Sequence, residues 1–155
     1  MPQRGHLRRL DIVWVKNPLY FVTVCCAKRR PILAHDSLAK IMISAWREST
    51  RLYGWTVGRY VIMPDHVHFF ARPQSNAMPL SFFMRNWKRW TANQIAKQTA
   101  ISLPLWQSEF FDHVIRSADS YTEKWRYVRE NPVRAGLVAT ANTWPYSGEI
   151  NLLQF

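Results

Sequence analysis

Residues 60–72 read YVIMPDHVHFFAR, and the rest of the chain is organised around this stretch. Two apolar runs flank a Pro-Asp pair, which predicts two strands joined by a tight turn. Because side chains at i and i+2 leave the same face of a strand, His66 and His68 should point one way and Val67 the other. Two imidazoles on one rigid face form half of a divalent metal site. The alternative is a pair of surface or half-buried histidines that bind nothing.

The composition indicates a basic globular protein. The 155 residues include 21 Lys and Arg against 10 Asp and Glu, a formal net charge of +11, with 48% hydrophobic residues. This length and balance predict a single domain over residues 1–155. The charge surplus favours a polyanionic partner, with nucleic acid as the first choice and an anionic membrane as the second. Because no apolar run approaches the roughly 20 residues of a membrane span, we expect no membrane partner.

Cys25 and Cys26 are the two cysteines of the chain. Adjacent residues of a strand point to opposite faces, so a disulfide between them is not expected. Without a disulfide framework, and with a basic N-terminus that lacks the apolar core of a signal peptide, the sequence predicts a cytoplasmic protein.

Hydrophobic periodicity predicts an alternation of strands and helices between two tails. The predicted elements are a strand over 20–27, a helix over 37–53, strands over 55–63 and 66–71, a helix from 79 to about 97, a strand over 112–116 and a helix from 119 to about 130. Residues 1–18 form a basic arm, which either orders on nucleic acid or remains a solvated tail, and residues 140–155 form an irregular tail. The first six elements match the ferredoxin-like βαββαβ order, an α+β fold with an antiparallel sheet, helices on one face and the first and third strands central.

The extra C-terminal helix carries a tyrosine outside its apolar stripe. At 100° per residue, Tyr121, Trp125 and Val128 form the buried side, whereas Tyr127 lies about 125° away on the flank. Asn131 follows Tyr127 by four residues and shares that flank if the helix extends so far. Its amide oxygen could be a third metal ligand. Alternatively, Asn131 caps a short turn that Pro132 begins.

These residues suit phosphoryl transfer. A free phenol has a pKa of about 10 and is a poor nucleophile at neutral pH. A divalent metal held by His66, His68 and a third oxygen donor would polarise a scissile phosphate. In-line attack by Tyr127 would form a phosphotyrosine, which stores the bond for rejoining.

The candidate DNA contacts are basic and aromatic residues from three parts of the chain. The helix over 79–97 interleaves basic residues with an indole, which suits single-stranded nucleic acid, although a solvated basic face is the alternative. The other candidates lie in the basic arm and near the tyrosine helix. The full set is Arg4, Arg8, Arg9, Arg85, Lys88, Arg89, Trp90, Arg116, Lys124 and Arg134.

The ordered motifs resemble a known family. His66-Val67-His68 is similar to the His-hydrophobe-His signature of the HUH single-strand endonucleases. MPDHVH at 63–68, Tyr127 followed by NPVRAGLV at 131–138, and WPYS at 144–147 together resemble the REP-associated tyrosine transposases, relatives of the single-tyrosine insertion-sequence transposases. The resemblance covers about residues 10–147, and the ordered set is far more specific than any one motif.

The resemblance implies a ferredoxin-like fold and a catalytic Tyr127 that forms a 5′-phosphotyrosine and leaves a free 3′-OH. It implies Mg²⁺ or Mn²⁺ at His66 and His68, with Asn131 at the third-ligand position, where the transposition relatives use glutamine. The implied substrate is single-stranded DNA near the foot of a hairpin from repetitive extragenic palindromes (REP), in the bacterial cytoplasm, with a monomer favoured over a dimer. The alternatives are a ferredoxin-like module that binds nucleic acid without cutting it, and a former transposase whose fold survives without activity.

Overall fold

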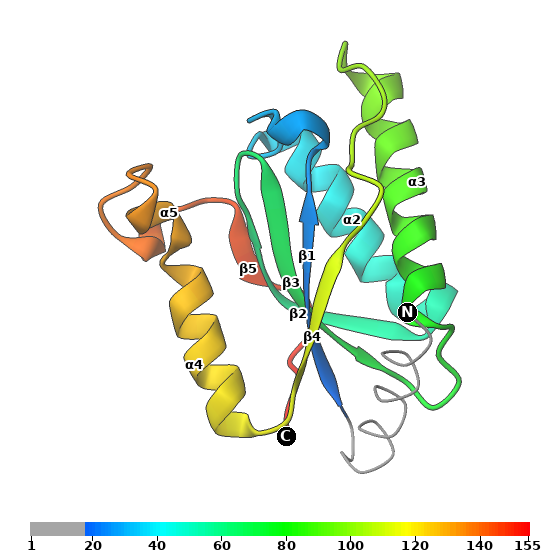
Figure 1. The fold of residues 1–155 in the computed structure, drawn as a ribbon, viewed down its shortest axis with the longest axis vertical. Helices are drawn as coiled ribbons and strands as arrows, with labels where there is room; N and C mark the ends of the chain where they lie inside the picture. The colour runs from blue at the N-terminus through cyan, green and yellow to red at the C-terminus, as the bar shows by residue number, and fades with distance from the viewer. Residues whose placement is uncertain (1–17) are drawn as a thin grey trace.

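The computed structural model describes residues 18–155. Most of the predicted basic arm, with Arg4, Arg8 and Arg9, lies outside the described residues. The elements in chain order are β1 (Leu19–Cys25), η1 (Ala27–Arg29), α2 (Asp36–Tyr53), β2 (Trp55–Ile62), β3 (His66–Pro73), α3 (Leu80–Gln98), β4 (Phe111–Ile115), α4 (Ala118–Arg129), α5 (Asn131–Arg134), η2 (Ala141–Thr143) and β5 (Ser147–Glu149) (Figure 1). Within residues 18–155, no helix is long and apolar enough to cross a bilayer.

The five strands form one antiparallel sheet in the order β4-β1-β3-β2-β5. The predicted βαββαβ order is confirmed, and so is the central position of the first and third strands. In the β1–β3 pairing, Thr23 lies opposite His68 and Cys25 lies opposite His66. On the other side of β1, His113 of β4 lies opposite Phe21.

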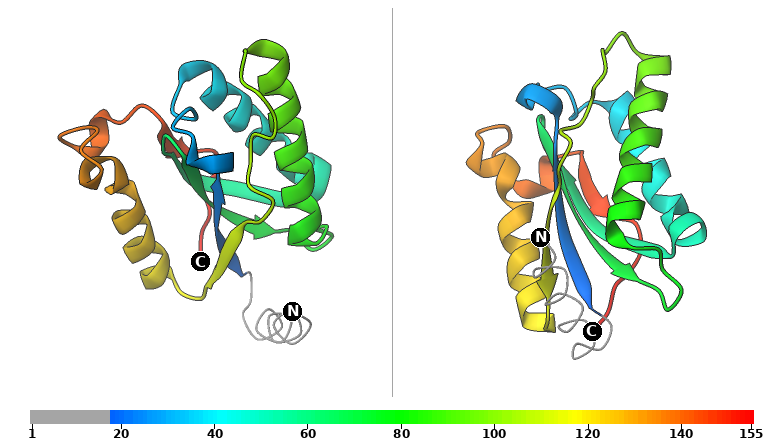
Figure 2. Two further views of the ribbon diagram at one scale, coloured as in Figure 1. Left: turned by 45° about the horizontal axis from the view of Figure 1, so that its top comes forward. Right: turned by 45° about the vertical axis from the view of Figure 1, so that its right-hand side comes forward.

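Helices cover both faces of the sheet (Figures 1 and 2). α2 and α3 pack on one face, where Trp46, Phe69 and Trp87 belong to the main core. α4 packs on the other face, where Tyr121 and Val128 join a second, smaller core. The sequence predicted helices on one face and an extra helix, and the structure places that extra helix, α4, against the opposite face.

The alternation along β3 decides what each face contains. Val67 and Phe69 are buried in the main core, whereas Phe70 is buried in the core under α4. His66 and His68 have the same parity as Phe70, so they lie on the α4 face.

The prediction of an irregular tail over 140–155 is wrong for residues 147–149. β5 pairs with β2, with Gly148 opposite Tyr60. A Cβ at Gly148 would lie 2.9 Å from the Tyr60 hydroxyl oxygen, so glycine permits this close approach. A strand of three residues is too short to produce a detectable hydrophobic alternation, which explains why the sequence pattern missed it.

Candidate active site

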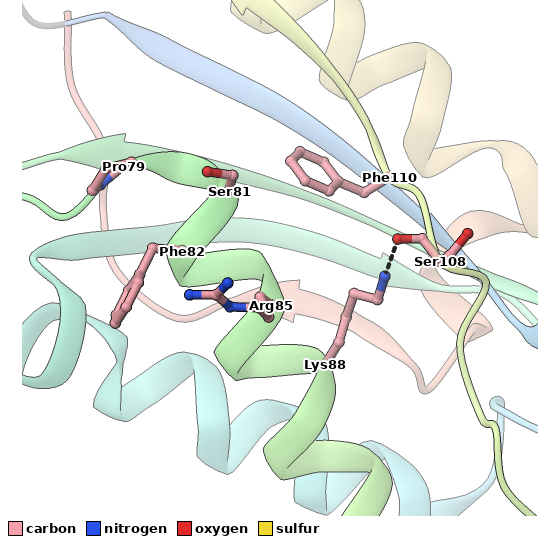
Figure 3. Close-up of a pocket in the computed structure, with 7 residues that line it drawn as sticks. All are labelled: Pro79, Ser81, Phe82, Arg85, Lys88, Ser108 and Phe110. Carbon is pink, nitrogen blue, oxygen red and sulfur yellow. Dashed lines mark hydrogen bonds between the residues drawn. The ribbon is translucent and has the colours of Figure 1, made fainter.

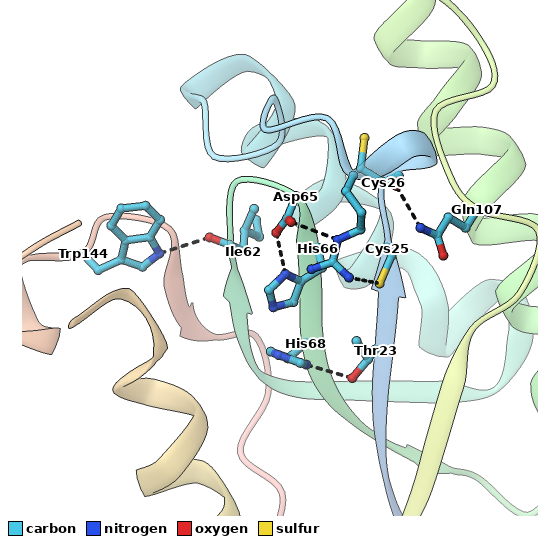
Figure 4. A network of polar contacts seen from close by, with 10 residues as sticks. Thr23, Cys25, Cys26, Ile62, Asp65, His66, His68, Gln107 and Trp144 are labelled. Carbon is cyan, nitrogen blue, oxygen red and sulfur yellow. Dashed lines mark hydrogen bonds and ion pairs between the residues drawn. The ribbon is translucent and has the colours of Figure 1, made fainter. Parts of the chain in front are cut away.

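His66 and His68 lie side by side at the start of β3 (Figure 4). Their ring centroids are 4.7 Å apart and the ring planes meet at 77°. Val67 is buried in the main core on the other side of the sheet, so the predicted division of the three side chains is confirmed. The spacing lets one nitrogen of each ring approach a common ion.

Each imidazole is oriented by a contact at its Nδ1. His66 Nδ1 lies 2.7 Å from Asp65 Oδ1, and because a carboxylate only accepts, the imidazole is the donor. His68 Nδ1 lies 2.8 Å from Thr23 Oγ1, across the β1–β3 pairing (Figure 4). A ring engaged at Nδ1 keeps its Nε2 for a ligand, which is how partner oxygens orient metal-binding histidines.

Arg29 supports this arrangement from the turn after β1. Its Nε donates to Asp65 Oδ2 at 2.9 Å, and its Nη1 lies 3.4 Å from Cys25 Sγ. Burial alone would raise the pKa of Asp65, but hydrogen bonds from Arg29 and His66 hold it below its ordinary value. Lys28 and Arg29 have φ angles of 57° and 53°, a left-handed conformation uncommon outside glycine. The strained turn therefore positions a cation that keeps the carboxylate beside His66 ionised.

His68 is held in its neutral form. Burial lowers the pKa of His68 to about 3, and electrostatic interactions with His66, Lys124 and Arg29 act in the same direction. The ring also stacks on Phe21, with centroids 5.1 Å apart. Because the neutral imidazole is the form that binds a metal, His68 can act as a ligand at neutral pH.

The donor set fits half of a coordination sphere. Across residues 18–155, no group of three or more His, Cys, Asp or Glu side chains is arranged to hold an ion. An ion at the histidine pair therefore needs further oxygen ligands, from an amide, water or a phosphate, and such ligands suit Mg²⁺ and Mn²⁺.

Tyr127 lies on the solvent side of α4. Its side chain is 62% exposed, whereas Tyr121 and Val128 of the same helix are buried, so the predicted helical faces are confirmed. Tyr127 lines a groove of about 270 Å³ between α4 and β4, and His113 and Lys124 line the same groove. The groove thus combines an accessible phenol with a cation, and the carboxylate of Glu123 also lines it.

Lys124 connects this groove to the histidine pair. Its Nζ lies 4.7 Å from the centroid of the Phe21 ring, and Phe21 stacks on His68. Tyr127 shares the groove with Lys124, and the contacts from Lys124 through Phe21 to His68 lie on one face of the sheet. The two halves predicted from distant parts of the sequence therefore occupy the same side of the molecule.

Arg134 contacts Tyr127 and Asn131 together. Its guanidinium carbon lies 3.9 Å from the centroid of the Tyr127 ring, and its Nη2 donates to the Tyr127 carbonyl oxygen at 2.7 Å. The same Nη2 donates to Asn131 Oδ1. Glu130 occupies the N-cap of α5 and Asn131 is its first residue, so the alternative of Asn131 as a cap is wrong.

The predicted DNA contacts within residues 18–155 fall on both faces of the sheet. Lys124 and Arg134 lie beside Tyr127, and Arg116 is exposed just before α4. The remaining four belong to α3, on the face opposite the histidines (Figure 2), and are Arg85, Lys88, Arg89 and Trp90. The sheet thus separates the histidines and Tyr127 from the predicted DNA contacts of α3.

Sequence reasoning missed Thr23, Asp65 and His113. The role of Thr23 depends on the register of β1 against β3, which no local pattern specifies. Asp65 directly precedes His66, but a Pro-Asp pair by itself indicates only a turn. His113 could have been found, because alternation over residues 111–115 gives it the same face as Ile115.

Comparison with known proteins gives one family. The family model described as "Transposase IS200 like" matches residues 15–131. An Escherichia coli (strain K12) protein named REP-associated tyrosine transposase is 26% identical over 141 residues, covering 86% of this chain and 78% of the relative. A Haemophilus influenzae protein, named as a candidate REP-associated tyrosine transposase, is 24% identical over 143 residues, covering 86% of this chain and 81% of the relative.

Two solved structures share the fold. The structure of a REP-associated tyrosine transposase bound to a REP hairpin aligns with a TM-score of 0.72 and 25% identity, covering 86% of this chain and 77% of that one. A Deinococcus radiodurans protein, solved as a candidate transposase, aligns with a TM-score of 0.57 and 17% identity. The alignment covers 75% of this chain and 92% of that one. The second likeness concerns the fold alone.

Proposed function

Because this chain belongs to the IS200-like transposase family, we propose that it nicks and rejoins single-stranded DNA beside a REP-type hairpin. Tyr127 is the nucleophile, and His66 and His68 bind Mg²⁺ or Mn²⁺ on a ferredoxin-like core. The observation that carries the proposal is the shared face: two oriented imidazoles and an exposed tyrosine, linked through Lys124 and Phe21.

The proposed substrate has independent support. The relative at TM-score 0.72 was solved with a REP hairpin bound, which supports a hairpin-bearing DNA here. The net charge of +11 favours binding to the phosphate backbone through counterion release. We further propose that the protein acts as a monomer in the bacterial cytoplasm.

The residues divide the chemistry between them. Tyr127 Oη loses its proton and attacks the phosphorus, the P–O3′ bond breaks, and O3′ takes up a proton. The upstream fragment leaves with a 3′-OH, and the downstream fragment stays joined to the tyrosine through its 5′ phosphate. When bound, the metal ion polarises the phosphate. Lys124 adds a positive charge beside the groove, which favours the tyrosinate and the charge that develops on phosphorus.

Asn131 is the proposed third ligand, and Arg134 sets a condition on that role. The amide oxygen of Asn131 already accepts a hydrogen bond from Arg134. A carbonyl oxygen has two lone pairs, so it can bind an ion while it keeps the guanidinium. In this arrangement Arg134 holds the nucleophile and the ligand in fixed relation.

The direct test is the formation of a covalent adduct with a hairpin-bearing oligonucleotide in Mn²⁺, observed on a denaturing gel. Wild-type protein forms the adduct, and Tyr127→Phe or an excess of chelator abolishes it. Tyr53→Phe, on the other face of the sheet, is the control and keeps the adduct. An adduct formed equally well by Tyr127→Phe would refute the assignment, and binding without adduct in any divalent metal would favour a non-catalytic binding module.

A further inference from the structure

We propose that a hollow between α3 and residues 108–110 is a second docking site for single-stranded DNA. It would bind the nucleotides that continue the DNA strand beyond the tyrosine groove. The inference rests on the proposed function, because it assumes that single-stranded DNA occupies the groove beside Tyr127. It extends the bound DNA from the α4 face to the opposite face of the sheet.

The hollow combines depth, positive charge and aromatic rings (Figure 3). Its volume is about 520 Å³, and its walls include Phe82, Arg85 and Lys88 of α3 and, across from them, Ser108 and Phe110. Among the described residues that line it, none is acidic. This composition is complementary to a phosphodiester with an unpaired base.

Each of the two cations is held at the wall of the hollow by a neighbouring group. The guanidinium carbon of Arg85 lies 5.4 Å from the centroid of the Phe82 ring, so the ring supports its apolar face. Lys88 Nζ donates to the Ser108 carbonyl oxygen at 2.8 Å, which anchors the ammonium at the wall and leaves its other N–H donors for a ligand. Partial burial lowers the pKa of Lys88, and an anion beside it would offset that cost.

Phe110 supplies a surface for a base. It is partly buried and packs against the main core on one side, and it lines the hollow on the other. A ring fixed in this way loses little entropy when a base stacks on it, and stacking accepts any base.

β4 provides the path between the two sites. It is an edge strand of the sheet, and Phe110, which directly precedes it, lines the hollow whereas His113 lines the tyrosine groove. Three residues of extended chain span about 10 Å, a distance that a few nucleotides cover. Between them, Phe111 is 58% exposed at the edge that the strand would cross.

The test compares two hairpin oligonucleotides by fluorescence anisotropy. In the truncated one the single strand ends at the tyrosine groove, and in the extended one it continues far enough to reach the hollow. Tyr127→Phe protein with Mn²⁺ is used, so that binding is measured apart from cleavage. Adding Arg85→Gln with Lys88→Gln should lower affinity for the extended oligonucleotide to the level of the truncated one. The slope of log K against log[salt] should fall by about 1.4, at about 0.7 for each lost phosphate contact on a single strand.

Phe110→Leu tests the stacking surface. The variant should bind the extended oligonucleotide roughly five- to a hundred-fold more weakly, and its affinity for the truncated one should not change. Leucine keeps the apolar contact with the core, and an unchanged thermal unfolding midpoint verifies the fold. A matched pair of substitutions, Arg51→Gln with Lys97→Gln, removes the same charge elsewhere and should leave the preference for the extension intact.

Three results would overturn the inference. They are equal losses for both oligonucleotides, an unchanged salt slope, and the same loss in the control pair. Failure of the proposed function is a separate result, because it is the absence of the Tyr127 adduct in otherwise wild-type protein. The hollow variants should still form that adduct with the truncated substrate at the wild-type rate.

Discussion

At Arg134, one guanidinium contacts the ring of Tyr127, the carbonyl of Tyr127 and the amide oxygen of Asn131. These contacts are internal to the site, although the sequence suggested that Arg134 binds DNA. A planar, forked group can stack on a ring while it donates hydrogen bonds, and an ammonium cannot reproduce both. We therefore expect Arg134 to position Tyr127, the proposed nucleophile.

Arg134→Lys should separate positioning from DNA binding. The rate of adduct formation at saturating DNA should fall by up to about 100-fold, because small displacements of a nucleophile have large kinetic effects. The affinity for the hairpin should change little, since the charge remains. Single-turnover kinetics measure both, and Arg126→Lys on the exposed side of α4 is the control. A loss of affinity with an unchanged saturating rate would instead assign Arg134 to DNA binding.

His68 should make the stability of the metal-free protein depend on pH. Its pKa is about 3 in the fold and 6.5 as a free side chain. Between these values the unfolded chain binds a proton that the folded protein does not, so the free energy of unfolding falls as the pH is lowered through this window. The contribution to the slope is at most about 1.4 kcal/mol per pH unit.

Urea denaturation at pH 7, 6 and 5 in chelator measures this slope. His68→Gln removes the titrating group, and its slope should be shallower than that of the wild type. Asp65, whose pKa is also lowered, contributes at more acidic pH and remains in the variant. Identical slopes in the two proteins would show that His68 is not held neutral.

Sequence periodicity could predict the faces of these residues but not their partners. The strand repeat placed His66 and His68 together, and the helical repeat placed Tyr127 outside the buried stripe. The contacts of Arg134 and Thr23 could not be predicted, because they depend on a turn geometry and a strand register that are set by tertiary packing.

At the scale of the elements, the pairing of β1 with β3 orients His68, one of the proposed metal ligands. Thr23→Val keeps the shape of the strand and removes the oxygen that contacts His68 Nδ1. Loss of such a supporting contact typically weakens metal binding by about 10- to 100-fold. Titration with Mn²⁺ followed by electron paramagnetic resonance tests this, with Thr122→Val on α4 as the control. Equal affinities in the variant and the wild type would contradict the role of Thr23.

The end of α2 depends on Gly54, which adopts a φ of 76°. A Cβ there would lie 2.7 Å from the Cα of Ala77, whereas one at Gly136, with a φ of 74°, would meet nothing within 4 Å. Gly136→Ala should therefore lower the free energy of unfolding by about 1–2 kcal/mol, for the left-handed conformation alone. Gly54→Ala should lower the free energy of unfolding by more, because the backbone at Ala77 must also move. Thermal unfolding of both variants measures the difference, and equal losses would contradict the close approach.

The order of the long elements could be predicted because each has a clear period and clear ends. The helix over 37–53 is one example, with Gly54 after it. β5 could not be predicted, since it has three residues and exists through its pairing with β2. The strand predicted over 20–27 ends earlier, at Cys25, because residues 27–29 turn into η1.

Across the whole molecule, the sheet separates a structural face from a face available for chemistry. α2 and α3 bury the aromatic core on one side, and α4 covers only part of the other through a smaller cluster. Periodicity cannot predict which face a helix covers, so the sequence did not place α4 opposite α2 and α3. That placement brings Tyr127 to the side that carries the histidines.

The proposed second docking site gives the structural face a role in DNA binding as well. A strand bound in the tyrosine groove and in the α3 hollow would wrap the β4 edge. Positively charged residues on both faces would then bind the DNA backbone, in keeping with the net charge of +11.

Mapping the covalent bond tests the central claim most directly. Wild-type protein is incubated with a hairpin oligonucleotide and Mn²⁺, digested with nuclease and protease, and analysed by mass spectrometry. The account predicts a nucleotide joined through its 5′ phosphate to Tyr127, and none in His66→Ala or in chelator. A nucleotide on any other residue, or one joined to Tyr127 through a 3′ phosphate, would contradict it.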